Sequence, residues 1–143
     1  MLREPTHRTM ALLELTDLTK SYVDPDGRSQ RILDIPSFAL EERQQAALAG
    51  TSGCGKTTIL RAIAGLEKPK SGEIHNFDRC FFGPKNNLPG NERNIGFIFQ
   101  DYAVFPHLNV SENILFGVKH KSEHVKTLTE MIQLLELQGH EKK

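Results

Sequence analysis

The chain has 143 residues, of which 38% are hydrophobic and 25% charged, so it is long enough to bury a core and polar enough to stay in solution. Its 18 basic and 18 acidic residues cancel, which argues against nucleic acid as the main partner, because nucleic-acid-binding domains usually carry a basic surplus. The two cysteines fit a reducing compartment, and no apolar run approaches the roughly 20 residues of a membrane-spanning helix. We therefore expect a cytosolic protein whose contact with a membrane goes through a partner.

The first ten residues, MLREPTHRTM, hold charges and a proline where a signal peptide needs an apolar stretch. We expect residues 1–10 to be a disordered leader and residues 11–143 to form the structured part. Met10 opens the first structured segment, so both Met1 and Met10 are candidates for the true start.

The next segment predicts a β-hairpin or a small antiparallel sheet. Leu12–Leu18 alternates in polarity like a strand, and Ile32–Leu40 is rich in branched and apolar residues. Between them, Asp24–Gly27 reads DPDG, a strong turn signal because proline presets φ and glycine tolerates positive φ.

A strand, a glycine-rich turn and a helix are expected next. Gln45–Ala49 is short and mostly apolar, as in a buried strand, and Gly55–Leu66 has helical periodicity with Gly65 as its stop. The apolar residues that share one face of this helix are Ile59, Leu60 and Ile63.

The middle of the chain alternates turns with short strands. We expect a turn at Pro69–Gly72, a short strand at Glu73–Phe77 and a loop at Gly83–Asn94, which is rich in Gly, Pro and Asn. Ile95–Phe99 reads as a buried strand, and Gln100–His107 as a connector.

Two helices are expected near the end. Ser111 is predicted to cap a helix that runs through Phe116, and Ser122 to cap another with Glu123 in its first turn. Gly139 is the predicted end of the second helix. Its apolar stripe consists of Val125, Leu128, Ile132 and Leu135.

The strongest chemical signal is a stretch that matches G-x-x-x-x-G-K-[ST] at every fixed position. Glycines let successive backbone N–H groups turn toward a phosphate, and the helix that follows aims its positive end at the same place. Lys56 supplies a charge for the β- and γ-phosphates and for the charge that develops during transfer, and Thr57 a hydroxyl for Mg²⁺. The residues predicted to bind the nucleotide are Gly50, Thr51, Ser52, Gly53, Cys54, Gly55, Lys56, Thr57 and Thr58.

The loop alone does not choose among ATPases, GTPases and small-molecule kinases, but three longer stretches do. They read LTDLTKSY, GTSGCGKTTILRAIAGLEKPKSGEI and IGFIFQDYAVFPHLNVSENILFG. From about Leu12 to its end, the chain resembles the nucleotide-binding subunit of ABC transporters. Its NLP-x-x-ER-x-IG-x-x-FQ run is most similar to importers of the ferric-iron, polyamine and sulfate kind.

The resemblance implies an α/β fold: part of a P-loop NTPase core, an N-terminal antiparallel β-subdomain and the start of a helical subdomain. It implies that Tyr22 stacks on the adenine of ATP, although a strand tyrosine without a ligand is the alternative. It also implies that Gln100 reaches Mg²⁺ and the attacking water, unless it is an ordinary polar residue at a strand end. Tyr102–Asn113 would lie near the surface that receives a short helix of the membrane subunit. Within that stretch, three apolar residues serve that contact or plain core packing: Phe105, Pro106 and Leu108.

The family also needs an LSGGQ-type signature, an apolar strand ending in Asp-Glu and a switch histidine, none of which follows Gln100 in this sequence. We therefore expect this chain to bind Mg-ATP without hydrolysing it alone, while the intact ATPase drives solute uptake. Expected partners are transmembrane permease subunits, a second nucleotide-binding subunit and, indirectly, a periplasmic or extracellular solute-binding protein, with the protein peripheral on the cytoplasmic face of the plasma membrane.

Two other interpretations remain. The chain could be a stand-alone nucleotide-binding or interaction module that docks on a membrane subunit. An unrelated P-loop kinase is a third interpretation, but it does not explain the FQ-x-YAVFPHLNVSENI match.

Two weaker signals complete the sequence. Cys54 lies at a helix N-terminus, which favours a reactive thiol, but filling the loop with a small side chain is the simpler role. His120 and His124 are four residues apart, as zinc ligands on a helix would be, yet nothing near them completes a coordination shell, so we expect no zinc site.

Overall fold

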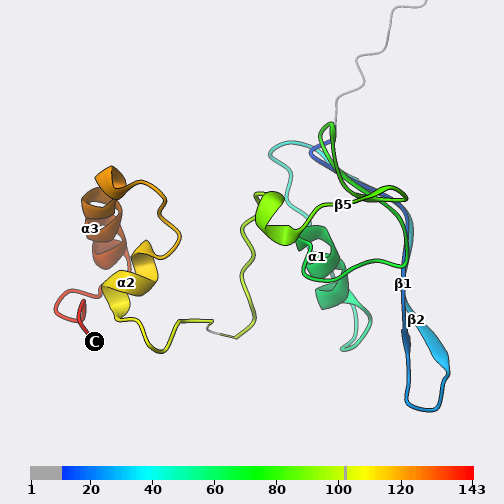
Figure 1. Cartoon of the computed structure of the whole chain (residues 1–143), viewed down its shortest axis with the longest axis horizontal. Helices are drawn as coiled ribbons and strands as arrows, with labels where there is room; N and C mark the ends of the chain where they lie inside the picture. The colour runs from blue at the N-terminus through cyan, green and yellow to red at the C-terminus, as the bar shows by residue number, and fades with distance from the viewer. Residues whose placement is uncertain (1–10, 102) are drawn as a thin grey trace, which may run out of the picture. The chain divides into compact units, whose positions relative to one another are not determined.

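In a computed structural model of the chain, residues 11–101 and 103–143 are described (Figure 1). The chain divides into two compact units, Met1–Phe97 and Ile98–Lys143, which we describe separately. The predicted leader, residues 1–10, and Tyr102 lie outside the described residues. Within the described part, no helix is both long enough and apolar enough to cross a membrane.

The first unit begins with the predicted hairpin. β1 (Leu13–Val23) pairs antiparallel with β2 (Ser29–Leu40), so both strands are longer than the sequence pattern indicated. The turn closes as expected, because the Gly27 N–H donates to the Asp24 carbonyl at 3.0 Å and the Arg28 N–H to Asp24 Oδ1 at 2.7 Å. The short-range turn chemistry therefore sets the start of the sheet.

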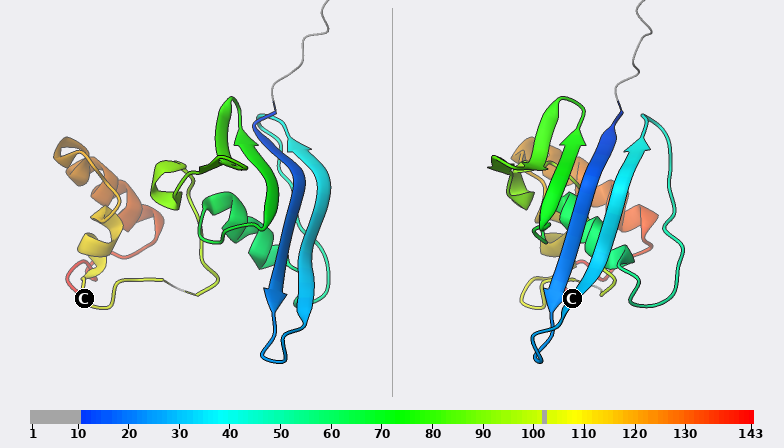
Figure 2. Two further views of the ribbon diagram at one scale, coloured as in Figure 1. Left: turned by 45° about the vertical axis from the view of Figure 1, so that its right-hand side comes forward. Right: turned by 90° about the vertical axis from the view of Figure 1, so that its right-hand side faces the viewer.

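The sheet has five strands in the order β2-β1-β3-β4-β5, and every neighbouring pair is antiparallel (Figure 2). The added strands are β3 (Ser71–Asn76), β4 (Arg79–Gly83) and β5 (Asn86–Asn87). The prediction that Gly83–Asn94 is all loop is wrong, because it contains β5 and a 3₁₀ turn, η1 (Gly90–Glu92). Hydrogen bonding to β4 makes this polar stretch a strand despite its turn-like composition.

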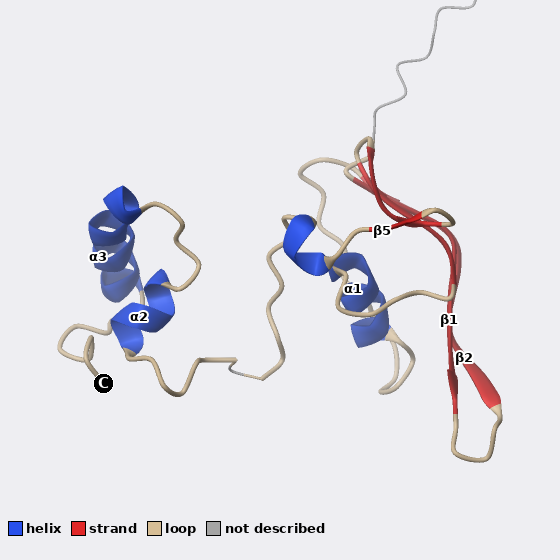
Figure 3. Ribbon diagram, viewed as in Figure 1, coloured by secondary structure: helices blue, strands red, loops and turns tan. Residues whose placement is uncertain are grey.

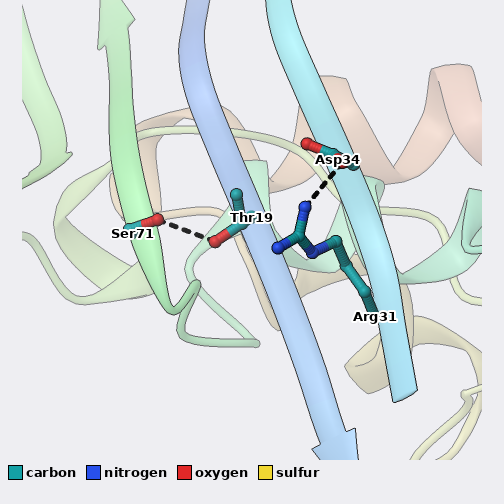
Figure 4. Close-up of polar contacts among 4 residues, drawn as sticks. All are labelled: Thr19, Arg31, Asp34 and Ser71. Carbon is teal, nitrogen blue, oxygen red and sulfur yellow. Dashed lines mark hydrogen bonds and ion pairs between the residues drawn. The ribbon is translucent and has the colours of Figure 1, made fainter. Parts of the chain in front are cut away.

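Side chains also tie the strands together (Figure 4). Thr19 Oγ1 on β1 lies 2.7 Å from Ser71 Oγ on β3, so a hydrogen bond links the two strands. Arg31 donates to Asp34 at 2.8 Å along β2, but this pair is exposed and contributes little stability.

The helix α1 (Lys56–Ala64) packs on one face of the sheet (Figure 2). Ala62 is 1% exposed and enters the core, with Ile59 and Ile63 half-buried beside it as predicted. The predicted place of Leu60 on this face is wrong, because Leu60 is 48% exposed. Gly65 ends the helix in the left-handed conformation, φ 77°, which confirms the predicted stop. The buried core residues around Ala62 are Leu15, Leu18, Ile74, Phe81 and Phe82.

A buried arginine fastens the carboxyl-terminal end of α1. Arg93 is 2% exposed, and its Nη1 donates to the carbonyls of Ala62 at 2.7 Å and Ile63 at 2.8 Å. Its Nε donates to the Leu88 carbonyl at 2.8 Å, and its guanidinium lies 5.4 Å from the Phe81 ring centroid. Burial lowers the pKa of Arg93, but an arginine stays protonated and its charge complements the negative end of the helix.

Two predicted strands are wrong. Gln45–Ala49 and Ile95–Phe99 have no strand structure and appear as loop in Figure 3. The first is exposed throughout, and Ile98 in the second is 96% exposed. Short apolar runs of this kind belong inside parallel sheets, where neighbours on both sides satisfy the backbone. The sheet of the described residues is wholly antiparallel and pairs with neither run.

The second unit contains α2 (Val110–Leu115), a 3₁₀ turn η2 (Lys121–Glu123) and α3 (His124–Leu134). Asn109, and not the predicted Ser111, caps α2. Asn109 forms a capping box with Glu112, in which each side chain accepts from the other's backbone N–H at 2.9 Å.

Ser111 lies inside α2 instead, and its hydroxyl donates to the Glu141 carbonyl at 3.1 Å. Ser122 lies inside η2 and provides no cap to α3, so that prediction is also wrong. α3 ends at Leu134, five residues before the predicted stop at Gly139, because the turn in which the Leu137 N–H donates to the Ile132 carbonyl ends it earlier.

The predicted stripe on α3 is only partly covered. Ile132 is buried and Leu128 half-buried, whereas Val125 is 78% exposed and Leu135 is 54% exposed. The side of α3 that packs is therefore narrower than the apolar pattern indicated.

We predict that Arg93→Met lowers the free energy of unfolding by about 2–4 kcal/mol, because one buried and two partly buried carbonyls lose a charged donor. Urea denaturation measures the change. Arg79→Met is the matched control, since Arg79 is exposed at the start of β4. Equal losses in the two variants would contradict a special role for Arg93.

Candidate functional site

The glycine-rich loop leads directly into α1. Residues 50–54 are exposed, and Ser52 and Gly53 form a turn before the helix begins at Lys56. The Ile59 N–H donates to the Gly55 carbonyl at 2.9 Å, so Gly55 joins the loop to the helical ladder. The loop is therefore exposed, and a backbone hydrogen bond joins its last residue, Gly55, to the helix.

Gly55 is the point where the loop meets the sheet. Its φ is 97°, and a Cβ there would lie 2.8 Å from the Ile32 carbonyl oxygen and 3.0 Å from Leu33 Cδ2. Both atoms belong to β2, so only glycine permits this approach. The loop and the amino-terminal end of α1 are therefore in close contact with β2.

Lys56 curls back into the loop. Its Nζ donates to the carbonyls of Gly50 at 2.9 Å and Thr51 at 2.7 Å, and it lies 3.7 Å from Cys54 Sγ. No side chain caps the first N–H groups of α1, and its first turn holds no acidic residue. An ammonium group and uncapped N–H groups at a helix N-terminus together favour an anion such as phosphate.

The chemistry of the first turn of α1 also fits Mg²⁺ bound with a phosphate. Thr57 is exposed there and offers a hydroxyl oxygen, and Thr58 beside it is half-buried. Across the described residues, no three His, Cys, Asp or Glu side chains gather closely enough to hold a metal by themselves. Mg²⁺ usually takes few protein ligands and draws the rest from phosphates and water, so Thr57 is the residue that would hold it.

A cleft of about 230 Å³ lies between β2 and the amino-terminal end of α1. Cys54, Gly55 and Lys56 form one wall, and Leu48 and Ile59 supply apolar surface. A larger cleft, about 510 Å³, lies by β3, β4 and β5. We assign the anion chemistry to the smaller cleft, because the loop, its lysine and the helix end converge there.

Tyr22, the predicted adenine-stacking residue, lies near the end of β1 in the same unit as the loop. It is 43% exposed, and Lys20 Nζ lies over its ring, 5.0 Å from the centroid. Lys20 also forms an ion pair with Glu67 at 2.5 Å. The hydrogen bond that Lys20 donates to Glu67, together with the positive charge of Lys20, lowers the pKa of Glu67 from its ordinary value of 4.5.

Gln100 belongs to the second unit and is exposed. Its predicted reach to Mg²⁺ and the attacking water therefore stays a prediction.

The side-chain amide of Asn113 forms several hydrogen bonds with the backbone of the predicted docking stretch. Asn113 Oδ1 accepts from the Phe105 N–H at 2.8 Å, and its Nδ2 donates to the carbonyls of Leu108 at 2.9 Å and Asn109 at 3.0 Å. The Phe105 ring centroid lies 4.0 Å from that of Phe116, which is 63% exposed. The loop before α2 is thus shaped locally and presents aromatic surface.

The two weaker sequence signals were Cys54 and the pair of His120 and His124. Cys54 is an exposed free thiol in the loop. His120 precedes η2, while His124 begins α3 with its ring 3.3 Å from the Val118 carbonyl.

Comparison with known proteins decides the family. Residues 33–143 match the family model described as ABC transporter. The chain belongs to the ABC transporter family. This ABC chain is 40% identical over 129 residues to the Fe(3+) ions import ATP-binding protein FbpC 2 of Haemophilus influenzae (strain ATCC 51907 / DSM 11121 / KW20 / Rd), a match that covers 90% of this chain and 35% of that protein. It therefore spans about a third of the length of this curated relative.

Two solved structures match the fold. Both are dimers of MJ0796, a bacterial ABC transporter cassette. The one in a post-hydrolysis state bound to ADP and Pi has a TM-score of 0.72 at 27% identity and covers 92% of this chain and 61% of that chain. The other has a TM-score of 0.68 at 26% identity and covers 91% and 60%. They confirm the predicted fold class, a partial P-loop NTPase core with an antiparallel β-subdomain.

Sequence reasoning missed three residues around the site. Lys20 could have been found, because it stands two residues before Tyr22 on one strand and so shares its side. Glu67 and Arg93 gave no such signal, since Glu67 meets Lys20, and Arg93 meets Ala62 and Ile63, across long stretches of chain.

We predict that Gly55→Ala destabilises the protein more than Gly53→Ala. Both glycines have positive φ, 97° and 79°, so each substitution costs about 1–2 kcal/mol of backbone strain. Only at Gly55 does the new methyl group also meet β2, since nothing lies within 4 Å at Gly53. Urea denaturation should show at least about 1 kcal/mol between the two variants, and equal losses would disprove the contact.

The Lys20–Glu67 pair predicts a pH dependence. Because folding lowers the pKa of Glu67, the stabilisation is present above the unfolded-state value near 4.5 and is lost as the pH falls through the lower folded-state pKa. The difference in unfolding free energy between the protein and Glu67→Gln should shrink over that range. A difference that stays constant from about pH 7 to about pH 3 would contradict it.

Proposed function

We propose that the chain is the ATP-binding part of an ABC importer ATPase, in which nucleotide binding and hydrolysis drive solute uptake across a membrane. The observation that carries the proposal is the loop itself. Lys56 lies inside its curve beside the uncapped amino-terminal end of α1, in a chain that belongs to the ABC family. This arrangement suits a phosphate group, because a positive charge and backbone N–H groups converge on the loop.

Each residue of the proposed site contacts a different part of the nucleotide. Loop residues 50–55 direct backbone N–H groups to the phosphates, and Lys56 exchanges its two carbonyl partners for phosphate oxygens. Thr57 would hold Mg²⁺, and Tyr22 stacks on adenine. Support comes from FbpC 2, which is named an ATP-binding protein, and from MJ0796, which is bound to ADP and Pi.

For hydrolysis, the chain supplies only part of the chemistry. Lys56 neutralises charge that develops on the transferred phosphoryl group, and Gln100 orients the attacking water. Mg²⁺ held by Thr57 would supply further positive charge to the phosphates. A general base typically contributes about 10²–10⁴-fold. Asp34 lines the cleft beside the loop, but its carboxylate accepts a hydrogen bond from Arg31 at 2.8 Å, so we do not assign it this role. We propose that these 143 residues bind Mg-ATP but do not turn it over alone.

The proposed partners follow from the family. They are transmembrane permease subunits, a second nucleotide-binding subunit and, indirectly, a solute-binding protein, with the protein peripheral on the cytoplasmic face of the plasma membrane. The 40% identity to an Fe(3+) importer component supports the importer assignment, and the MJ0796 dimers support the second subunit.

A non-catalytic docking module is the second candidate. The observation that favours it is the Asn113-organised loop with the Phe105–Phe116 pair, which presents aromatic surface on a compact unit of its own. Such a module would bind a membrane subunit without needing turnover.

We predict that Lys56→Ala weakens Mg-ATP binding at least about tenfold, because a charge-assisted contact to phosphate is lost. Isothermal titration calorimetry measures the affinity. Lys85→Ala, at an exposed lysine between β4 and β5, is the control and should bind as the parent protein does.

Steady-state phosphate release from the same samples tests the catalytic claim. The parent chain should release no more phosphate than Lys56→Ala. Clear turnover above that control would show that the chain is catalytically sufficient. Unchanged ATP affinity in Lys56→Ala would overturn the nucleotide site itself.

A further inference from the structure

The Lys20 side chain, on β1, contacts three groups: two lie just after α1, and the third is the ring of Tyr22 on β1. Its Nζ donates to the Lys68 carbonyl at 2.7 Å and pairs with the Glu67 carboxylate at 2.5 Å. It also lies 5.0 Å from the centroid of the Tyr22 ring. The Lys20 and Glu67 side chains are only 15% and 24% exposed, so this ammonium is fixed in place.

The strand pairing places this cluster on the same side of the sheet as the loop. The pairing of β1 with β2 shifts register between Lys20 and Ser21. Lys20 Nζ nevertheless lies over the Tyr22 ring, so these two side chains leave the same side of the strand. Lys20 stands opposite Leu33 on β2, and residues directly opposite in an antiparallel pair share a face. Leu33 is the buried side chain against which Gly55 rests. Tyr22 therefore faces the side that carries the phosphate loop.

The contacts of Lys20 separate it from the phosphates. Glu67 neutralises its charge, and the Lys68 carbonyl takes a further N–H, so little of the ammonium is free for a second anion. The Lys20 ammonium group still contacts the Tyr22 ring. Lys20 lies over that ring, and the Tyr22 side chain also forms a hydrogen bond with Glu67. Tyr22 remains 43% exposed.

We propose that Lys20, fixed by Glu67, is a positioning residue for the nucleotide base: it covers one face of the Tyr22 ring and leaves the other face to the purine. The inference rests on the proposed ATP-binding function and adds the residues that orient the base. A cation over an aromatic face attracts the π electrons and limits how far the ring can turn. The base then meets a ring that already has its bound orientation, which reduces the ordering cost of binding.

Two ligands separate a role at the base from a role at the phosphates. ATP carries both groups, whereas inorganic tripolyphosphate carries only the phosphates. Calorimetric titration of each with the purified protein in Mg²⁺ gives two affinities for every variant, and thermal unfolding is recorded alongside.

Lys20→Gln removes the charge but keeps a donor for the Lys68 carbonyl. We expect it to weaken ATP binding about three- to tenfold and to leave tripolyphosphate binding unchanged. Lys20→Arg, which keeps a cation over the ring, should retain most of the ATP affinity. Lys70→Gln removes a charge from a nearby exposed lysine and should change neither affinity.

A double substitution tests the route through Tyr22. Tyr22→Ala should weaken ATP binding selectively, and adding Lys20→Gln to it should cause no further loss. A further loss of the same size as in the parent background would overturn the proposal.

The remaining outcomes are also decisive. Equal losses for ATP and tripolyphosphate in Lys20→Gln would overturn the proposal in favour of a phosphate or stability effect. Unchanged ATP binding in Lys20→Gln, with a selective loss in Tyr22→Ala, would remove Lys20 from the site while leaving the proposed function intact. If neither Lys56→Ala nor Tyr22→Ala weakens ATP binding, the proposed function and this inference both fail.

Discussion

The position of the phosphate loop depends on how α1 is held at its two ends. At the carboxyl-terminal end, the buried guanidinium of Arg93 donates to the carbonyls of Ala62 and Ile63 in the last turn of the helix. At the other end, Gly55 allows the backbone to rest on β2. Between these fixed points, Ala62 packs into the core. The exposed loop is therefore carried on a helix that has little freedom to shift.

In this chain of zero net charge, one positive group, Lys56, lies where phosphate would bind. Lys56 lies inside the loop, and the first turn of α1 holds no acidic residue. Lys20, in contrast, is neutralised by Glu67 and turned toward an aromatic ring. We propose that one lysine serves the phosphates and that the other orients the aromatic ring for the base. The distinction lies in the partners of each ammonium group and not in its residue type.

Features set by near neighbours in the sequence were predictable. The DPDG turn, the helix after the glycine-rich loop and its stop at Gly65 all follow from local backbone preferences. The caps were harder, because Asn109 and Ser111 are both good caps and only the capping box with Glu112 selects between them. The apolar runs at Gln45–Ala49 and Ile95–Phe99 failed as predicted strands, since a strand exists only where another segment supplies its hydrogen bonds.

The sequence by itself determined the chemistry of the site: a motif whose glycines, lysine and threonines suit phosphate and Mg²⁺, together with the family resemblance that the comparisons confirm. Tertiary structure alone decided which side chains support that chemistry. Arg93 meets α1, and Glu67 meets Lys20, across long stretches of chain. Such contacts depend on how β1, β3 and the end of α1 pack together, and no local pattern of residues records that packing.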